Sequence, residues 1–368
     1  MSKPIGDMRT GAHEGAQALL ARTAAADGAA HRALGTAIAD FGLSENDRLD
    51  ERTRAALARL LHGLIATIES EVGGHAVRLL RAQGEAALAD MLAAQKGVAG
   101  RLHASGLLRD PVLMGELIAR VRQDLLAGGM AAQAQDEPER ASLLNRLAQH
   151  PDRLLAQSAA AVLVSESRRR SLPDAQAQSD LPAELHYKLV WQVAAGLRAG
   201  FAGPAPALDR ALADSAQRSL AAHDEGDRLE AAAMRLAVAI DARPDELPEL
   251  LAEALGDRRV ALFAAVLAHA LRIDFEAARA MTLDSASGRL WVALRALDFD
   301  RAAVARLGVA LSQADPRRDV EAFADQLDTI MAVDADEARA AIAPLGLPAD
   351  YRSALLALEG GQWKNGPR

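Results

Sequence analysis

The stretch from residue 244 to residue 312 limits the fold more than any other part of this chain, because short apolar segments with helical spacing follow one another there. In the middle segment, Phe263 and Leu267 lie on one side, while Leu262 and Val266 make the opposite side apolar as well. A helix with two apolar sides has to be covered by neighbours on both of them. We therefore expect a core helix packed between other helices.

Aspartates separate these apolar segments, at Asp257, Asp274, Asp284, Asp298 and Asp300. A short carboxylate at such a position can accept hydrogen bonds from the free N–H groups of a new helical turn. Helices of roughly 9 to 14 residues joined by short turns are what stacked helical pairs require. The pattern predicts an array of short antiparallel helix pairs, which is a HEAT-like α-solenoid.

Helical spacing extends through the rest of the chain, and no stretch has the alternating pattern of a β-strand. Further helix caps are expected at Asp110 before Pro111, at Asp180, and at Asp315 before Pro316. The predicted fold class is therefore all-α, with an N-terminal helical bundle or hairpin ahead of the HEAT-like array.

The clearest boundary in the chain is the glycine- and proline-rich run at 203–206. We expect an N-terminal helical bundle or hairpin at 1–100 and a central helical-repeat region at 101–203. A C-terminal HEAT-like array should follow at 204–359, and residues 360–368 should form a frayed tail.

Residues 49–80 keep one helical face apolar over several turns. Gly73 and Gly74 interrupt this helix, so we expect either a bend or a close neighbour at that point. An apolar face of this length can also pair with a second copy of the chain. A homodimer through residues 49–83 is therefore one expectation for this region.

Composition narrows the classes of protein that fit. The 368 residues are 50% hydrophobic but only 3% aromatic, so the core must consist largely of Ala, Leu and Val. The chain has no cysteine, which excludes disulfides, thiolate zinc sites and cysteine nucleophiles. A formal net charge of -8 disfavours nucleic-acid binding. No run approaches the roughly 20 apolar residues of a membrane span, and the N-terminus lacks the apolar core of a signal peptide. We expect a cytoplasmic protein with neither a nucleic-acid nor a membrane partner.

His62 is the strongest candidate for chemistry, because it lies on the polar side of the 49–80 helix. Phosphotransfer domains and sensor kinases carry their phosphoryl group on a solvent-facing histidine of a helical hairpin. The residues that follow here, Gly63 to Thr67, differ from the pattern of those families. An ordinary surface histidine is the simpler interpretation.

Other catalytic and metal-binding patterns are weaker still. Glu71 and His75 have the spacing of a helical ligand pair, but no second cluster of histidine and glutamate accompanies them. No phosphate-binding loop, dinucleotide fingerprint or nucleophile elbow is present. We expect no enzymatic activity, no cofactor and no bound metal.

A run of three arginines, Arg168, Arg169 and Arg170, ends a predicted helix. The simpler interpretation is that these cations offset the negative end of the helix dipole. The alternative is an anchor for an acidic protein partner, assisted by Tyr187 and Trp191 on the next helix, because arginine and large aromatic residues are enriched at binding hot spots.

Three segments together resemble the bacterial domain-of-unknown-function family DUF2336. They are HPDRLLAQSAAAVLVSESRRR at 150–170, DLPAELHYKLVWQVAAGLR at 180–198, and the array at 247–309. The resemblance extends from about residue 44 to residue 345. It implies an all-helical protein with HEAT-like repeats, and it transfers no catalytic residue.

These observations predict a non-enzymatic adaptor or scaffold that binds another protein, in bacterial signalling or stress regulation. An alternative from another class is a phosphotransfer or histidine-kinase-regulating domain that uses the 44–100 hairpin. A third interpretation is an enzyme or ligand-binding bundle whose site leaves no recognisable sequence pattern.

Overall fold

A computed structural model describes residues 49–130, 141–170, 179–285, 288–352, 354, 355 and 358. All regular secondary structure in this part of the chain is helical, which confirms the all-α prediction. The chain divides into two compact units, residues 1–54 and 55–368. Residues 1–48 and the predicted tail at 360–368 lie outside the described residues.

The described helices are arranged as follows along the chain. The first half contains α2 (Glu51–Ala82), α3 (Ala86–Ala93), α4 (Val98–Ser105), η2 (Leu107–Arg109), α5 (Pro111–Gly129), α6 (Leu143–Ala148), α7 (Arg153–Arg170), α8 (Ala183–Arg198) and α9 (Pro206–Ala222). The second half contains η4 (Glu225–Asp227), α10 (Leu229–Ile240), α11 (Leu247–Gly256), α12 (Val260–Leu271), α13 (Phe275–Leu283), α14 (Arg289–Ala296), α15 (Arg301–Ala314), α16 (Val320–Ala332), α17 (Ala335–Ile342) and η5 (Ala343–Gly346).

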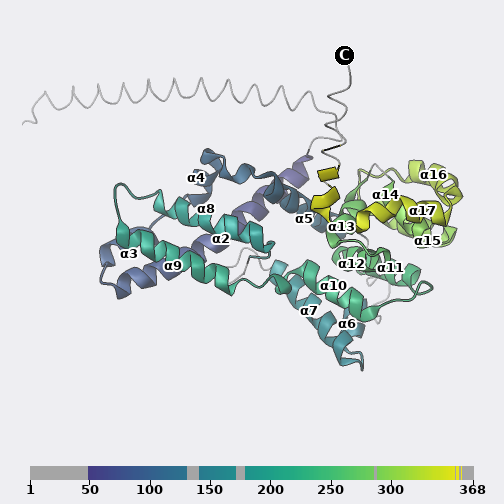
Figure 1. The fold of residues 1–368 in the computed structure, drawn as a ribbon, viewed down its shortest axis with the longest axis horizontal. Coiled ribbons are helices and arrows are strands. Elements are labelled where there is room, and N and C mark those ends of the chain that lie inside the picture. The colour runs from purple at the N-terminus through teal and green to yellow at the C-terminus, as the bar shows by residue number, and fades with distance from the viewer. Residues whose placement is uncertain are drawn as a thin grey trace, which may run out of the picture. The chain divides into compact units, whose positions relative to one another are not determined.

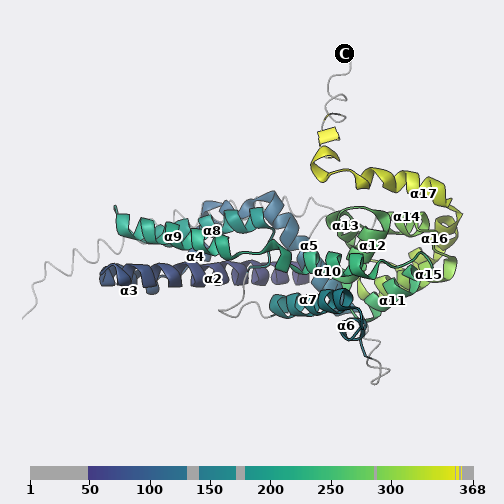
Figure 2. The same ribbon diagram turned by 60° about the horizontal axis from the view of Figure 1, so that its bottom comes forward.

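Helix α2 is the longest described helix, and it runs through both glycines of its interior without ending. Its apolar face is buried within the chain, where Leu64, Ile68 and Val72 have almost no exposed surface. A Cβ atom at Gly73 would lie 3.7 Å from a methyl group of Leu197 on α8, an ordinary contact. Figures 1 and 2 show α8 and α9 alongside α2. Helix α2 therefore has close neighbours at the position where the glycine pair indicated a bend or a neighbour.

Helix α12 is covered on both sides, as its sequence predicts. Every residue from Val260 to Ala268 is buried, including the full side chains of Phe263 and Leu267. Helices α10, α11 and α13 pack against it, and α5 contacts it as well. Burying large apolar side chains contributes about 1.5–3 kcal/mol each, so this helix is a major source of stability.

The turns after α12 and α14 have the same construction. The first residue adopts a left-handed backbone conformation, the second is a buried apolar residue whose N–H bonds back to the preceding helix, and the third is an aspartate that caps the next helix. The two sets are Arg272, Ile273 and Asp274, and Asp298, Phe299 and Asp300. Asp274 accepts from the N–H of Ala277 at 2.6 Å, and Asp300 accepts from the N–H of Ala303 at 2.8 Å.

Five of the predicted caps are wrong. Asp284 ends α13, and Asp298 lies in the turn before the actual cap, Asp300. Asp180 accepts from Arg169 instead of capping α8, whose N-cap is Pro182 without a side-chain bond. Asp315 ends α15, and Asp319 caps α16 instead. Asp257 does not cap the helix that follows it but accepts from the N–H of Leu143, the first residue of α6. Asp180 and Asp257 are therefore bound by groups outside the helix that follows them, and Asp319 replaces Asp315 as the cap of α16.

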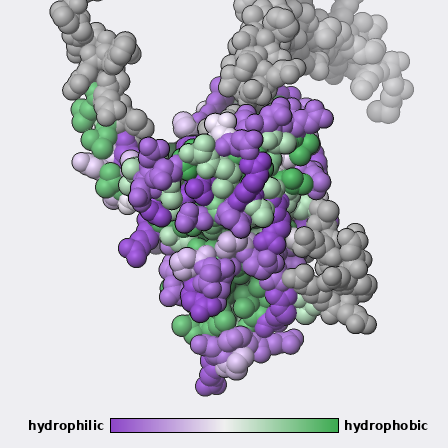
Figure 3. All heavy atoms as spheres, turned by 90° about the vertical axis from the view of Figure 1, so that its right-hand side faces the viewer, coloured by the Kyte–Doolittle hydropathy of each residue, from purple (hydrophilic) through white to green (hydrophobic). Residues whose placement is uncertain are grey.

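Helix α5 connects the parts of the core in the second unit, since it contacts α12, α13 and α15. Its N-terminus is capped as predicted, because Asp110 accepts from the N–H groups of Val112 and Leu113. On the face shown in Figure 3, hydrophilic residues surround smaller areas of hydrophobic ones. Among the described residues, no helix combines the length and the apolar character needed to cross a membrane.

Candidate functional site

A buried cluster of charged side chains joins α5, α7, α10 and α13. Each member has at most 9% of its side chain exposed, and the set comprises Glu116, Arg120, Arg169, Arg228, Glu230 and Arg279. Ionised groups this deep in a protein are stable only when paired and hydrogen-bonded. The pairing therefore explains how several arginines can occupy the interior.

Arg169 is at the centre of this cluster. It donates to Asp180 and to Glu230, in both cases at 2.6 Å. Burial alone would raise the pKa of the Glu230 carboxyl, but Arg169 and Arg228 hold that pKa well below its usual range. Burial likewise opposes the charge of Arg169, but Glu230 and Asp180 raise its pKa above that of free arginine. Both groups therefore stay ionised and tie α7 to α10.

The three arginines predicted as a partner anchor all lie in the last turn of α7, but their environments differ. Arg169 is buried and paired inside the chain, whereas Arg168 makes an exposed ion pair with Asp227. Arg170 has 70% of its side chain exposed and lies 3.7 Å from Glu166. Binding of an acidic partner by Arg168 and Arg170 stays a prediction, and Arg169 is already engaged by internal carboxylates.

Tyr187 and Trp191 lie one turn apart on α8, and their rings pack edge to face with centroids 6.3 Å apart. The opposite face of α8 is buried, which directs Tyr187 outward. Tyr187 is 56% exposed, and Trp191 is half-buried. In the described residues no hydrogen bond, ion pair or ring contact links these aromatic residues to the arginines at the end of α7.

Two polar contacts hold η2 and the start of α5 beside this face of α8. Gln192 donates to the carbonyl of Leu107 at 3.5 Å, and Lys188 lies 3.2 Å from the carboxylate of Asp110. Two further apolar side chains, Leu107 and Val112, are exposed on these segments. Leu107, Val112, Tyr187 and Trp191 together form what we call the α8 apolar surface.

His62 lies on the exposed side of α2, as predicted. Its Nδ1 is 2.7 Å from the carbonyl oxygen of Ala58, which can only accept, so Nδ1 carries the hydrogen. In the neutral ring Nε2 is therefore unprotonated. The side chain lines a cavity of about 730 Å³ together with Arg59, Arg120 and Asp124.

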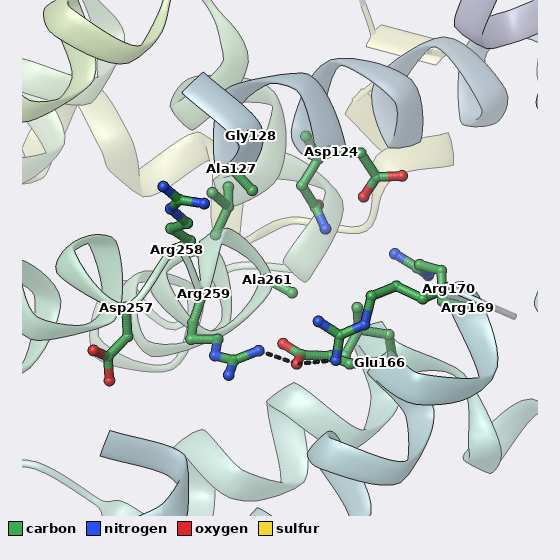
Figure 4. Close-up of a pocket in the computed structure, with 13 residues that line it drawn as sticks. Asp124, Ala127, Gly128, Glu166, Arg169, Arg170, Asp257, Arg258, Arg259 and Ala261 are labelled. Atoms are coloured by element: carbon green, nitrogen blue, oxygen red, sulfur yellow. Dashed lines mark hydrogen bonds and ion pairs between the residues drawn. The ribbon is translucent and has the colours of Figure 1, made fainter. Parts of the chain in front are cut away.

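A second cavity, of about 540 Å³, lies between α5, the end of α7 and the turn that joins α11 to α12 (Figure 4). The charged residues that line it are Asp124, Glu166, Arg169, Arg170, Asp257, Arg258 and Arg259. Arg259 forms an ion pair with Glu166 across the cavity. Burial raises the pKa of Glu166 above its usual value, although Arg259 opposes that shift.

His75, which has the spacing of a helical ligand pair with Glu71, has a hydrogen-bond partner on another helix. His75 hydrogen-bonds to Ser215 on α9 at 3.0 Å. Burial lowers the pKa of His75, and the nearby Arg218 adds to this effect. In the described part of the chain, no three metal-binding side chains are grouped in a way that could hold an ion.

Sequence reasoning missed a stacked pair of histidines, His186 on α8 and His223 at the end of α9. Their ring centroids are 4.1 Å apart, and His186 is only 3% exposed. Burial, with a smaller effect of His223, lowers the pKa of His186 to about 4. No local spacing relates positions on two different helices, so the sequence carries no signal for this pair.

The comparison with protein families identifies the chain. Residues 137–343 match the family DUF2336, described as an uncharacterised protein conserved in bacteria. The chain belongs to the DUF2336 family. This confirms the family resemblance found in the sequence, over a shorter range than the expected 44–345. The matched residues include α8 and the lining of the cavity of Figure 4 apart from its α5 residues. Comparisons with curated proteins and with solved structures found no significant match.

Proposed function

We propose that this DUF2336 protein is a non-enzymatic scaffold that binds a protein partner through the α8 apolar surface. The observation that carries the proposal is the exposed Tyr187 packed against the half-buried Trp191, with exposed Leu107 and Val112 on segments that contact α8. Large aromatic side chains are enriched at the energetic centres of protein interfaces. Grouped exposed apolar residues of this kind are typical of interaction sites.

The turn geometry of the C-terminal half supports a HEAT-like arrangement of helix pairs. The turns after α12 and α14 repeat one construction, and α12 packs against α13 as a helical hairpin, whereas α14 packs mainly against α17. Stacked hairpins present extended surfaces suited to holding another macromolecule.

The buried charged cluster supports a structural rather than a catalytic role for its members. Arg169, Glu230 and Arg279 each have a partner within ion-pair distance inside the chain. Catalytic groups usually face a cleft with part of their bonding capacity available to substrate. Side chains that are paired with one another in this way stabilise the packing of helices instead.

The two tyrosines of the chain offer a matched test. Tyr187 and Tyr351 are 56% and 54% exposed, but only Tyr187 belongs to the α8 apolar surface. We would purify the full-length tagged protein and its Tyr187→Ala and Tyr351→Ala variants from native lysate at equal amounts. Quantitative mass spectrometry would then compare the proteins that accompany each variant.

We expect one or more proteins to accompany the wild type and the Tyr351→Ala variant but to be depleted at least tenfold with Tyr187→Ala. A hot-spot side chain contributes at least about 2 kcal/mol, which corresponds to this loss or a larger one. Equal recovery with both variants would remove the support for the α8 apolar surface. Recovery of the protein alone from the wild-type lysate would remove the support for a scaffold.

A second candidate is phosphotransfer at His62, which the geometry of its ring favours. The bond from Nδ1 to Ala58 leaves Nε2 of the neutral ring available as a nucleophile, and Arg59 and Arg120 line the same cavity. We expect acid-labile phosphate on the wild type in the presence of an active partner kinase and none on His62→Gln. His103→Gln, which changes another exposed histidine, should keep the label. Label retained by His62→Gln would exclude this function.

A further inference from the structure

The cavity shown in Figure 4 has the size of a small-molecule site and an unusual density of guanidinium groups. Its volume of about 540 Å³ lies within the range of about 300–1,000 Å³ found for ligand pockets. Arg169 and Arg170 reach it from the end of α7, and Arg258 and Arg259 reach it from the turn after α11. Arginines from two separate helix ends therefore line one space, and Figure 4 shows Arg258 on the side near Ala127 and Gly128.

Two of the three carboxylates that line this cavity already have partners. Glu166 is bound by Arg259, and Asp257 accepts the N–H of Leu143. Figure 4 shows the Asp257 carboxylate directed away from Arg169 and Arg170. The third, Asp124, has its pKa raised by desolvation, which weakens it as a counter-ion.

The arginines retain donors without a matching acceptor. In Arg169, Nη1 is buried and has no hydrogen-bond partner among the described residues, although the other nitrogens contact Asp180 and Glu230. The Arg258 side chain is exposed, and no hydrogen bond or ion pair to it occurs within the described part of the chain. Leaving a buried donor unsatisfied costs about 1–3 kcal/mol or more when it is charged, so an acceptor at this position would be favoured.

Arg258 also occupies a backbone position that favours glycine. Its φ angle is 61°, and its N–H bonds to Leu255 while that of Arg259 bonds to Ala254, which is the Schellman arrangement at the end of α11. Arg272 has the same left-handed conformation at the end of α12 but lines a different cavity. Arg272 therefore provides a matched control for any effect of Arg258 on the backbone.

We propose that this cavity binds a small phosphorylated molecule, whose phosphate oxygens accept hydrogen bonds from Arg169, Arg170 and Arg258. The planar guanidinium group presents paired N–H donors that match phosphate geometry. Three such groups around a space of this size suit a pyrophosphate or a nucleotide. This inference does not depend on the protein-binding role of α8, which involves other residues.

Isothermal titration calorimetry on the full-length protein tests the proposal directly. Sodium pyrophosphate and ATP would be titrated separately, without divalent cations and at one fixed ionic strength. The wild type should bind at least one of them, and Arg258→Gly and Arg170→Ala should each weaken binding at least tenfold. Arg272→Gly should bind as the wild type does. Tighter binding of pyrophosphate would assign a free polyphosphate ligand, and tighter binding of ATP would assign a nucleotide.

Urea denaturation separates loss of the site from loss of the fold. Because glycine prefers the left-handed conformation, Arg258→Gly and Arg272→Gly should both unfold at a urea concentration no lower than the wild type does. Three results would overturn the proposal. They are no binding by the wild type, unchanged binding by Arg258→Gly, and equal competition by sodium sulfate at the same ionic strength, which would indicate non-specific anion binding.

Discussion

The end of α7 and the turn after α11 both carry consecutive arginines, yet the structure uses adjacent members differently. At the end of α7, Arg169 is 7% exposed and bound by two carboxylates, whereas Arg170 is 70% exposed and 3.7 Å from its nearest carboxylate. After α11, Arg259 is paired with Glu166 and Arg258 is exposed. All four line the cavity, but in each region one arginine is paired with carboxylates of the fold and its neighbour is exposed.

Adjacent arginines differ in exposure because only one of each pair lies close to carboxylates from other parts of the chain. Arg169 points toward Asp180 and Glu230, which come from other parts of the chain. A buried charge that is paired in this way becomes costly to the fold as soon as one partner is lost, whereas exposed ion pairs contribute about 0–1 kcal/mol. Substitutions of adjacent residues should therefore have very different effects on stability.

The largest expected effect is that of Arg169→Ala. Removing this side chain leaves Glu230 buried without its closest partner, and we expect the free energy of unfolding to fall by about 3–5 kcal/mol. Arg170→Ala removes an exposed side chain and should change it by less than about 1 kcal/mol. Urea denaturation measures both. Similar losses in the two variants would show that the comparison between neighbours is wrong.

The next effect concerns a basic group that is buried without a carboxylate, His186. Its pKa of about 4, compared with an ordinary value of 6.5, means that the unfolded chain takes up the proton more readily. The stability from the neutral ring is therefore fully present above pH 6.5 and is lost as pH falls from 6.5 to 4, by about 3 kcal/mol in total.

Stability measured between pH 7.5 and pH 4 checks this sign and size. His186→Phe keeps an aromatic ring beside His223 but cannot titrate, so it should lose this part of the acid sensitivity. His103→Phe, at an exposed position on α4, should retain it. Equal acid sensitivity in the wild type and His186→Phe would contradict the assignment to His186.

A smaller effect is expected from two adjacent glycines at the end of α5. A Cβ atom at Gly129 would lie 2.1 Å from the carbonyl oxygen of Ala314, a backbone atom that cannot easily move. Gly129→Ala should therefore destabilise the protein by about 1–3 kcal/mol. Gly128 lines the cavity and has no atom within 4 Å of such a Cβ, so Gly128→Ala should be neutral or slightly stabilising. Thermal denaturation that ranks the two variants in the opposite order would contradict this packing.

The smallest effect concerns the second arginine pair. Arg259→Ala removes a partly buried ion pair with Glu166, and we expect a loss of about 1–2 kcal/mol, less than a fully buried pair would cost because some screening remains. Arg258→Ala should change stability by less than about 0.5 kcal/mol, since its side chain is exposed. Both values can be read from urea midpoints. A greater loss of stability in Arg258→Ala than in Arg259→Ala would contradict the conclusion that Arg259, and not Arg258, stabilises the fold.

Local features of the fold were predictable from the sequence. The two apolar sides of Val260–Ala268 predicted a helix buried all round, and Asp274 and Asp300 cap helices as expected. These features depend on contacts within one or two turns or on the pattern of one helix. The sequence pattern therefore contains them directly.

Long-range pairing was not predictable in the same way. Arg169 and Glu230 are 61 positions apart, and no spacing rule connects an arginine at one helix end with a glutamate in a later helix. The sequence around Asp180 is typical of a helix cap, but in the folded chain its carboxylate accepts a hydrogen bond from Arg169 instead. The cavity of Figure 4 was missed for the same reason, because its arginines come from separate helix ends.

Site-specific photocrosslinking in bacterial cells that naturally make the protein tests the scaffold proposal most directly. A photoreactive amino acid would replace Tyr187 in one strain and Tyr351 in another, since both positions are about equally exposed. A discrete protein adduct at position 187 that is absent at position 351 is the predicted result. No adduct at position 187, or the same adducts at both positions, would contradict binding through the α8 apolar surface.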